Sequence, residues 1–67
     1  MKTLREAREE RRIKQKDVAD ALKVTRQTYA KYEKNPREMP VFQAEAACAF
    51  IGCEVSEIFF GNMSSET

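Results

Sequence analysis

Several residue types are missing or scarce in this 67-residue chain, and each absence narrows what the protein can do. There is no histidine, no glycine-rich phosphate loop and no cluster of carboxylates in an apolar setting. Without them the chain offers no acid–base or nucleophile constellation. Two cysteines five positions apart cannot complete a four-ligand zinc site. We therefore expect no enzyme, no metal site and no cofactor.

Glycine and proline are also rare, with two of each, and this scarcity argues against long β-hairpins. The longest apolar run, residues 46–51, has six residues, far short of the roughly 20 in a membrane span. No signal peptide is visible. Cys48 and Cys53 are interpreted as reduced thiols in a cytoplasmic, bacterial or phage-encoded protein, in preference to a disulfide.

Apolar residues recur at spacings of three and four, while alternation with a period of two is nearly absent. This pattern indicates an all-α protein. A chain of 67 residues has room for one small domain with a modest core. We expect that domain over residues 1–61, followed by a flexible tail over residues 62–67.

Three helices are predicted in the first half of the chain. The first opens with a capping box of Thr3 and Glu6 and runs to about Arg12. The second covers residues 15–22, and the third covers residues 25–34. The third begins at a threonine, which is a good N-cap. A short turn joins the second and third helices, as in a helix-turn-helix motif.

Two further helices are predicted after a loop at residues 35–40. The first spans residues 41–51 and is closed by Gly52, and the second spans residues 55–60. The row of Val41, Ala44, Cys48 and Ile51 is spaced for burial. A second apolar stripe, which exceeds what one small core needs, consists of Phe42, Ala46, Ala49 and Phe50.

Charge is divided unevenly along the chain, although the total is only +1. All 12 Lys and Arg lie in residues 1–37 beside six acids, a net charge of +6, and residues 38–67 carry five acids and no base. Such a dipolar domain can present a basic face to a polyanion. The alternative is that the N-terminal helices are merely solvated and joined by ion pairs one turn apart.

The third helix opens with a row of hydrogen-bond donors. Arg26 can bond guanine O6 and N7 together, and Gln27 can bond adenine N6 and N7. Lys31 reaches a guanine or a phosphate, and Thr28 offers a methyl to thymine or a hydroxyl to phosphate. The alternative is an ordinary solvated surface. Tyr29 and Tyr32, on the inward side of this helix, are interpreted as core residues.

A second set of residues is placed to contact phosphate. Gln15 lies at a helix N-terminus, where backbone N–H groups favour an anion. Thr25 begins the third helix, and Lys14 and Lys16 flank Gln15. Surface solubility explains the two lysines equally well.

These residues resemble the phage repressor/Cro-like, or XRE, helix-turn-helix family over about residues 3–60. The resemblance is carried by Gln15, Ala19, Leu22, residues 24–28, Tyr32, Glu33, residues 51–52 and residues 55–59. It implies a five-helix, lambda-repressor-like bundle whose third helix enters the DNA major groove. Positions matching the family's base contacts are Arg26, Gln27 and Lys31.

The resemblance also implies structural roles. Gln15 matches a residue that touches phosphate and buttresses the third helix, and Arg8 with Glu33 matches an ion pair beneath the helices. There are departures from the family pattern. Lys23 stands where glycine is common and needs a left-handed or adjusted turn. Asn35 replaces a glycine after the third helix as a residue that tolerates the left-handed region.

Together these features predict a dimeric, sequence-specific transcriptional repressor of the phage or mobile-element type, bound to double-stranded DNA. The expected dimer surface consists of Phe42, Phe50, Phe59 and Phe60. Two alternatives remain open. One is an antitoxin that binds DNA and also a toxin or other regulatory protein. The other is a protein-interaction adaptor without a DNA role.

Overall fold

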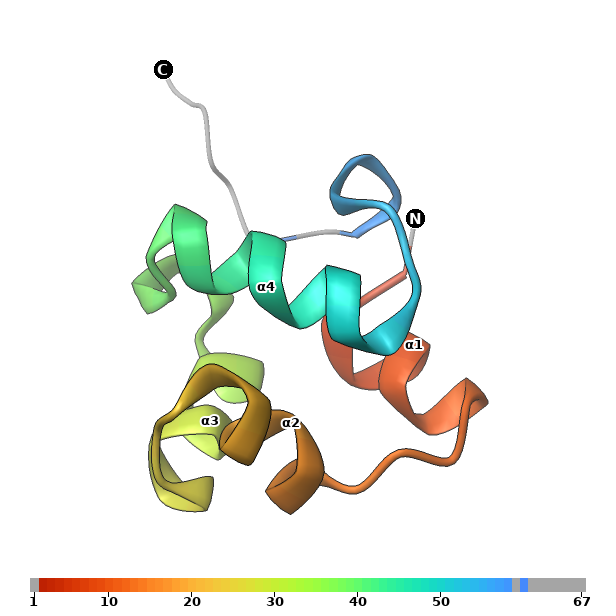
Figure 1. The fold of residues 1–67 in the computed structure, drawn as a ribbon. Coiled ribbons are helices and arrows are strands. Elements are labelled where there is room, and N and C mark those ends of the chain that lie inside the picture. Colours follow the sequence, from red (N-terminus) through yellow and green to blue (C-terminus); the bar gives the residue numbers. More distant parts are fainter. Residues whose placement is uncertain (1, 59, 61–67) are drawn as a thin grey trace.

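The computed structural model describes residues 2–58 and 60, and over that range the protein is built from helices (Figure 1). The one β-type feature recorded there is an isolated parallel bridge between Lys2 and Ile58. The prediction of an all-α fold is confirmed. The elements, in chain order, are α1 (Leu4–Glu10), α2 (Gln15–Leu22), α3 (Arg26–Lys34), η1 (Pro36–Glu38), α4 (Val41–Ile51) and η2 (Val55–Glu57), where η denotes a 3₁₀ turn.

The helix α1 begins as predicted and ends early. Thr3 accepts the Glu6 N–H at 3.1 Å, and the Glu6 carboxylate accepts the Thr3 N–H at 2.9 Å. The expected end at about Arg12 is wrong, because the helix stops at Glu10 and Arg12 takes a left-handed backbone (φ 57°). That conformation reverses the chain, so that Ile13 N–H bonds the Arg8 carbonyl at 3.2 Å.

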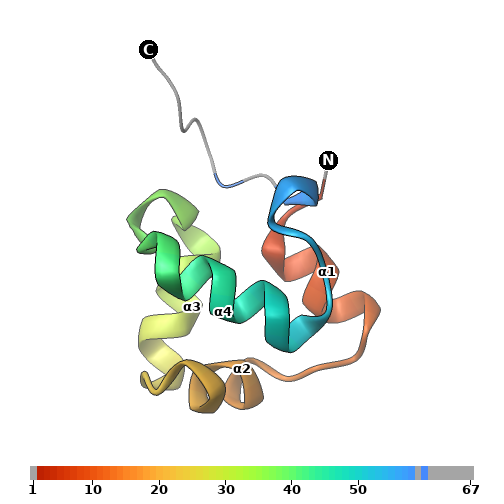
Figure 2. The same ribbon diagram turned by 45° about the horizontal axis from the view of Figure 1, so that its top comes forward.

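The core forms where α4 crosses α2 and the N-terminal helix (Figure 2). Leu4, Val18, Tyr29 and Cys48 are fully buried at its centre. The expected burial of Val41 is wrong, since that side chain is 74% exposed. Val41 lies in the first turn of α4, and the buried row of α4 begins only at the next turn.

The segment after α4 contradicts the prediction of a fifth helix at residues 55–60. Only a single 3₁₀ turn forms, and Ile58 after it is extended (φ −104°, ψ 134°). The reason lies far away in sequence: Lys2 pairs with Ile58, and the Lys2 N–H donates to the Glu57 carbonyl at 3.3 Å. The extended backbone turns the Ile58 side chain into the core, where it is 4% exposed.

The fate of the expected dimer residues differs among the four phenylalanines. Phe42 and Phe50 are exposed, at 67% and 47%. Phe60 is only 7% exposed and belongs to the core cluster, so its assignment to a dimer surface is wrong. The expectations for Phe59 and for the tail at residues 62–67 lie outside the described residues.

Gly52 and Asn35 were both expected to suit a left-handed backbone at the end of a helix. Gly52 caps α4 with a left-handed backbone (φ 95°), as predicted. Asn35 does not, because its backbone is at φ −130° and ψ 77°. The physical reason is Pro36, whose ring pushes the preceding residue away from helical conformations and into extended ones. Part of the predicted loop, residues 36–38, then forms the 3₁₀ turn η1.

Candidate nucleic-acid interface

The turn between α2 and α3 determines where α3 begins. Lys23 ends α2 in a left-handed conformation (φ 61°, ψ 41°), as its place in the turn required, and its N–H donates to the Asp20 carbonyl at 3.1 Å. Thr25 then caps α3, because its hydroxyl oxygen accepts the Thr28 N–H at 3.1 Å. The turn residues therefore satisfy backbone groups locally and leave the first outward side chains of α3 unobstructed.

The outward side of α3 carries two adjacent polar rows. Arg26, Gln27 and Lys31 are exposed, and they line one shallow groove together with Ala30 and Lys34. Residues four apart lie on the same side of a helix, so Arg26, Ala30 and Lys34 form one row and the other two residues form the next. The structure thus brings together three of the four residues expected to contact bases.

The two threonines assigned to the site are bonded to each other. The Thr25 hydroxyl donates to the Thr28 hydroxyl oxygen at 2.9 Å, and the Thr28 side chain is half-buried. Their hydroxyl groups therefore serve the helix cap, and neither threonine lines the groove on α3 or the larger groove described next.

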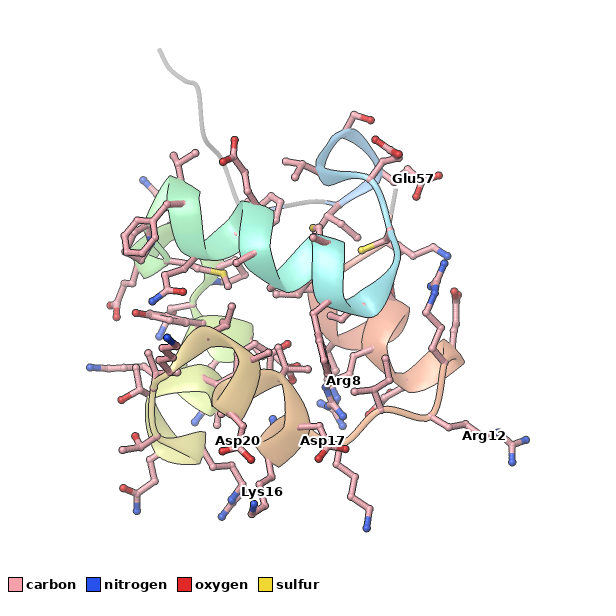
Figure 3. All side chains as sticks on the ribbon, viewed as in Figure 1. Arg8, Arg12, Lys16, Asp17, Asp20 and Glu57 are labelled. Atoms are coloured by element: carbon pink, nitrogen blue, oxygen red, sulfur yellow. The ribbon has the colours of Figure 1, made fainter. Side chains whose placement is uncertain are left out.

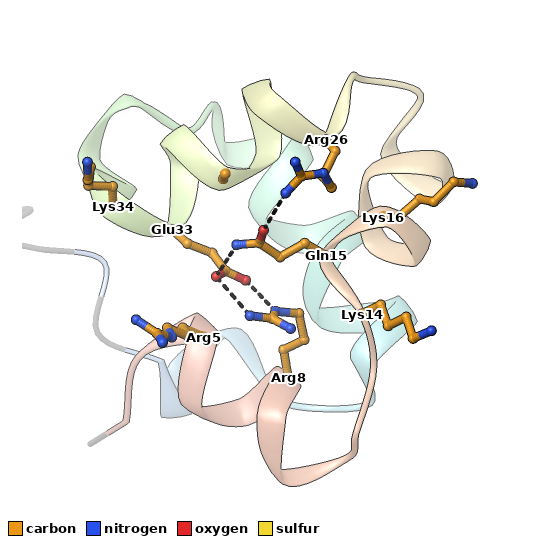
Figure 4. A pocket seen from close by; sticks show the side chains of 9 residues that line it. Arg5, Arg8, Lys14, Gln15, Lys16, Arg26, Glu33 and Lys34 are labelled. Atoms are coloured by element: carbon orange, nitrogen blue, oxygen red, sulfur yellow. Dashed lines mark hydrogen bonds and ion pairs between the residues drawn. The ribbon is translucent and has the colours of Figure 1, made fainter.

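A larger basic groove lies between α1, α2 and α3 (Figure 4). It holds all the side chains of α2 expected to contact phosphate. We call it the basic groove, and its lining residues are Arg5, Arg8, Lys14, Gln15, Lys16, Arg26, Ala30, Glu33 and Lys34.

Sequence reasoning missed Arg5 and Lys34 as members of this groove. Helical spacing contained the signal in both cases. Arg5 lies one turn before Arg8 on α1, and Lys34 lies two turns after Arg26 on α3. Once Arg8 and Arg26 are placed on one surface, helical spacing places Arg5 and Lys34 on it as well.

Beneath the groove, Arg8 and Glu33 form the ion pair that the family resemblance implied. Arg8 Nε and Nη2 donate to the two Glu33 carboxylate oxygens at 2.6 and 3.2 Å. Arg8 Nη1 also donates to the Ile13 carbonyl at 2.8 Å. The side chains are only 10% and 4% exposed, so the bidentate pair joins α1 to α3 in a nearly dry setting.

Gln15 extends this pair toward the surface. Its Nε2 donates to Glu33 Oε1 at 3.0 Å, and its Oε1 accepts from Arg26 Nη1 at 3.4 Å. An ionised carboxylate only accepts hydrogen bonds, so the Gln15 amide must turn its NH₂ group inward and its carbonyl outward. The orientation of Gln15 is therefore dictated by Glu33, and the outward carbonyl holds the Arg26 guanidinium.

The charges in this network shift one another. Burial raises the pKa of Glu33, but the hydrogen bonds from Arg8 and Gln15, together with the nearby Tyr29 hydroxyl, outweigh burial and hold that pKa below its ordinary value. The hydrogen bond to Glu33 raises the pKa of Arg8. Burial, followed by proximity to Glu33, raises the pKa of the Tyr29 hydroxyl far above its ordinary value. At neutral pH the network therefore contains a carboxylate, a guanidinium and a neutral phenol.

Positive charge is left over on this side of the molecule. Lys16 pairs with Asp20 at 3.2 Å and Arg5 pairs with Glu9 at 3.0 Å. Figure 3 shows Lys16 and Asp20 at the end of the molecule opposite Glu57. Within residues 2–58 and 60 no ion pair is recorded for Lys14, Arg26, Lys31 or Lys34. These cations are available to a polyanion.

The two cysteines lie away from the groove, at the end of α4. Both are free thiols, with Cys48 buried and Cys53 half-buried. Burial, then the neighbouring Cys53, raises the pKa of Cys48 to about 12, so that thiol is protonated and unreactive at neutral pH. The described residues contain no group of three or more Cys, Asp or Glu side chains suited to a metal ion.

Comparison with protein families identifies the family to which this fold belongs. A family model described as helix-turn-helix, HTH_3, matches residues 4–58. The chain therefore belongs to the XRE-type helix-turn-helix family, whose members are Cro- and C1-like DNA-binding regulators. Comparisons with curated proteins and with solved structures gave no match. No described helix has the length and apolar character needed to span a bilayer.

Proposed function

We propose that this protein is a sequence-specific transcriptional regulator that inserts α3 into the DNA major groove. The observation that carries the proposal is the exposed surface of Arg26, Gln27 and Lys31 on α3, where the Glu33–Gln15 network contacts Arg26. An adaptor without a DNA role has no need of a positioned guanidinium on a helix face. The Gln15 carbonyl lies 3.4 Å from Arg26 Nη1, which favours a guanidinium directed along this surface.

The side chains divide into two roles on DNA. Arg26 bonds the O6 and N7 atoms of a guanine, Gln27 bonds an adenine, and Lys31 contacts a base or phosphate further along the groove. The cations of the basic groove contact backbone phosphates, which adds affinity and positions α3 without sequence preference. Lys14, Lys16 and Lys34 take this second role, together with the backbone N–H groups at the α2 N-terminus. The Gln15 side chain does not, because its NH₂ group donates to Glu33 and its outward carbonyl only accepts.

Repression follows from occupancy. A single domain of this size makes few base contacts, so a two-fold dimer on an inverted repeat supplies a longer footprint. A bound dimer covers a promoter and excludes other proteins from it. The match to the Cro- and C1-like family favours a repressor of the phage or mobile-element type.

Selection from a random pool of double-stranded DNA, at near-physiological salt, tests the proposal. We expect enrichment of a short motif containing a guanine, present as an inverted repeat with centres about one helical turn apart. Arg26→Ala removes the preference at that guanine. Retention that is uniform across sequences and is simply weakened by salt, with no enriched motif, contradicts the proposal.

A further inference from the structure

Two thiols at the end of α4 play no part in the proposed DNA binding. Cys48 lies in the last turn of α4 and is 1% exposed, whereas Cys53 follows the cap residue Gly52 and is half-buried. Both belong to one packed region, because Cys48 is a member of the core cluster and Cys53 packs against that cluster. One thiol of the pair is therefore closed to solvent, and the other is open to a small reagent.

The separation of the two cysteines in sequence hides how close they are. In an uninterrupted α-helix, residues five apart have Cα atoms about 8.6 Å apart, which is too far for a disulfide. Gly52 prevents that arrangement, because its left-handed backbone (φ 95°) turns the chain back over the last turn of α4. The N–H groups of Gly52 and Cys53 then both donate to the Cys48 carbonyl, at 2.8 and 2.9 Å. The bond from Cys53 is the closure of a Schellman motif.

This closure brings the cysteines within the range of a disulfide. Two residues joined by an N–H···O=C bond of 2.9 Å have Cα atoms no more than about 6.8 Å apart. Disulfides span about 4.4–6.8 Å between Cα atoms. Side chains at these two positions of a Schellman motif also commonly touch across the cap. A disulfide here is therefore within reach without unwinding α4.

We propose that Cys53 is a site of reversible thiolation by low-molecular-weight disulfides, and that Cys48 resolves the adduct into an intramolecular disulfide across the α4 cap. The product closes a ring of six residues and ties the chain after α4 covalently to the core. Neither cysteine lines the groove on α3 or the basic groove. The inference is therefore independent of the proposed DNA-binding function, and either can fail without the other.

The chemistry is two successive thiol–disulfide exchanges with a reagent RSSR. In the first, Cys53 gives up its proton and its sulfur attacks one sulfur of RSSR. The Cys53–S–S–R bond forms, the S–S bond of the reagent breaks, and the leaving RS⁻ takes up a proton. In the second, Cys48 gives up its proton and attacks the Cys53 sulfur, and the second RS⁻ leaves and is protonated. Two protein thiols are oxidised, and one RSSR is reduced to two RSH.

The surroundings of the two thiols set the order of these steps. Cys48 is buried and its pKa is raised to about 12, so it does not begin the reaction. Part of that rise comes from Cys53 itself and is removed once Cys53 is held in a mixed disulfide. The target sulfur is then a neighbour in the same molecule, which favours the second step over attack by any free thiol.

Mass spectrometry of the intact chain tests both steps. The reduced full-length protein is incubated with hydroxyethyl disulfide, which is uncharged, so that the adjacent Glu54 does not repel it. We expect a transient adduct of one hydroxyethylthio group on Cys53, followed by a product two hydrogen atoms lighter than the reduced chain. That product should be monomeric on a non-reducing gel and should return to the dithiol with dithiothreitol. An unreactive wild-type chain, or a covalent dimer as the main product, overturns the proposal.

Two cysteine variants, with folding checked by circular dichroism, assign the roles. Cys48→Ala should react as fast as wild type and stop at the adduct, because it has no resolving thiol. Cys53→Ser should stay unmodified over the same time, because its remaining thiol is buried. A wild-type chain that also stops at the adduct overturns the resolving role of Cys48. A Cys53→Ser variant that reacts as fast as wild type overturns Cys53 as the site.

A third variant tests the role of the cap. Gly52→Ala places a side chain at a left-handed position, where it is strained even though the nearest atom, Arg11 Nε, leaves room at 3.6 Å. We expect this variant to form the adduct normally and to resolve it several-fold more slowly than wild type. Equal rates of resolution would show that the left-handed cap is not what brings the two thiols together.

The effect of the disulfide is measured by comparing the oxidised and reduced wild-type chains. The cap is otherwise held to α1 by hydrogen bonding, since Arg11 Nη2 donates to the Gly52 carbonyl at 3.1 Å. A covalent ring restricts the unfolded chain, so we expect the oxidised form to melt several degrees higher. The amide protons of Gly52 and Cys53 should also exchange more slowly. An unchanged or lower Tm on oxidation overturns the stabilising effect.

Discussion

The N-terminal and C-terminal halves of this small domain use polar and apolar surface in opposite ways. On the side of α1, α2 and α3, even buried positions carry charge, as in Arg8 and Glu33, and exposed polar groups are held by hydrogen bonds. On the outward side of α4, most exposed positions are apolar, and Glu45 is the one charged residue in the helix. In the first half of the described chain, donors and unpaired cations gather on one exposed surface, the surface on which the proposed DNA binding depends. The second half leaves apolar side chains exposed to water, which is energetically unfavourable unless another surface covers them.

The comparison predicts where the largest loss of stability lies. Replacing Arg8 with alanine leaves the Glu33 carboxylate buried without its cation, and breaking a buried pair in this way costs about 3–5 kcal/mol. Urea denaturation measures the free energy of unfolding. Arg5→Ala is the matched control, since its exposed pair with Glu9 contributes about 0.5 kcal/mol or less. Equal losses in the two variants would remove the distinction between a buried network and an ordinary charged surface.

Acid should weaken the same network. Because the pKa of Glu33 is lower in the folded protein than its ordinary value of 4.5, its ionisation stabilises the fold at pH values above 4.5. That stabilisation is lost as pH falls below 4.5. We expect Glu33→Gln, although less stable at neutral pH, to lose less of its remaining stability between pH 5 and pH 3. Parallel acid limbs for both proteins, measured by urea denaturation at each pH, would contradict this assignment.

The surface of the basic half is expected to matter for DNA and not for folding. Arg26→Ala should cost about 1–3 kcal/mol of binding free energy on the selected site and relax the preference at one base pair. Its stability should change by less than about 0.5 kcal/mol, because Arg26 is exposed. Arg12→Ala removes the same charge from a position outside the basic groove. Titration of both variants on selected and scrambled DNA separates base contact from general attraction.

The features predicted most accurately from the sequence are those that depend only on neighbouring residues. Thr3 and Thr25 begin helices because a side-chain oxygen meets an N–H three residues on, a wholly local matter. The predicted helix near Ile58 does not form, because Ile58 pairs instead with Lys2, which is distant in sequence. Phe60, which was assigned to a dimer surface, is buried in the core cluster. For the site, helical spacing correctly placed Arg26, Gln27 and Lys31 on one exposed side.

Contacts between distant residues were beyond what spacing alone provides. Arg8 and Glu33 are 25 positions apart, and only the family resemblance suggested that they pair. The link from Gln15 to Arg26 needed the actual distances, since an amide can present either end. Asn35 shows a different failure: the following proline was a local signal that outweighed the tolerance of asparagine for the left-handed region.

The smallest predicted effect concerns the turn that joins the two helices of the motif. Lys23 holds a left-handed backbone (φ 61°), which costs an L-residue roughly 1–2 kcal/mol and costs glycine little. Lys23→Gly should therefore stabilise the protein by about 0.5–1 kcal/mol after the greater entropy of unfolded glycine is counted, and raise Tm by a few degrees. Ala21→Gly, two residues earlier in helical backbone, should destabilise by about 1 kcal/mol. A higher Tm for Lys23→Gly and a lower Tm for Ala21→Gly would show that the backbone at Lys23 is strained. A lower Tm for both variants would show that Lys23 is not strained there.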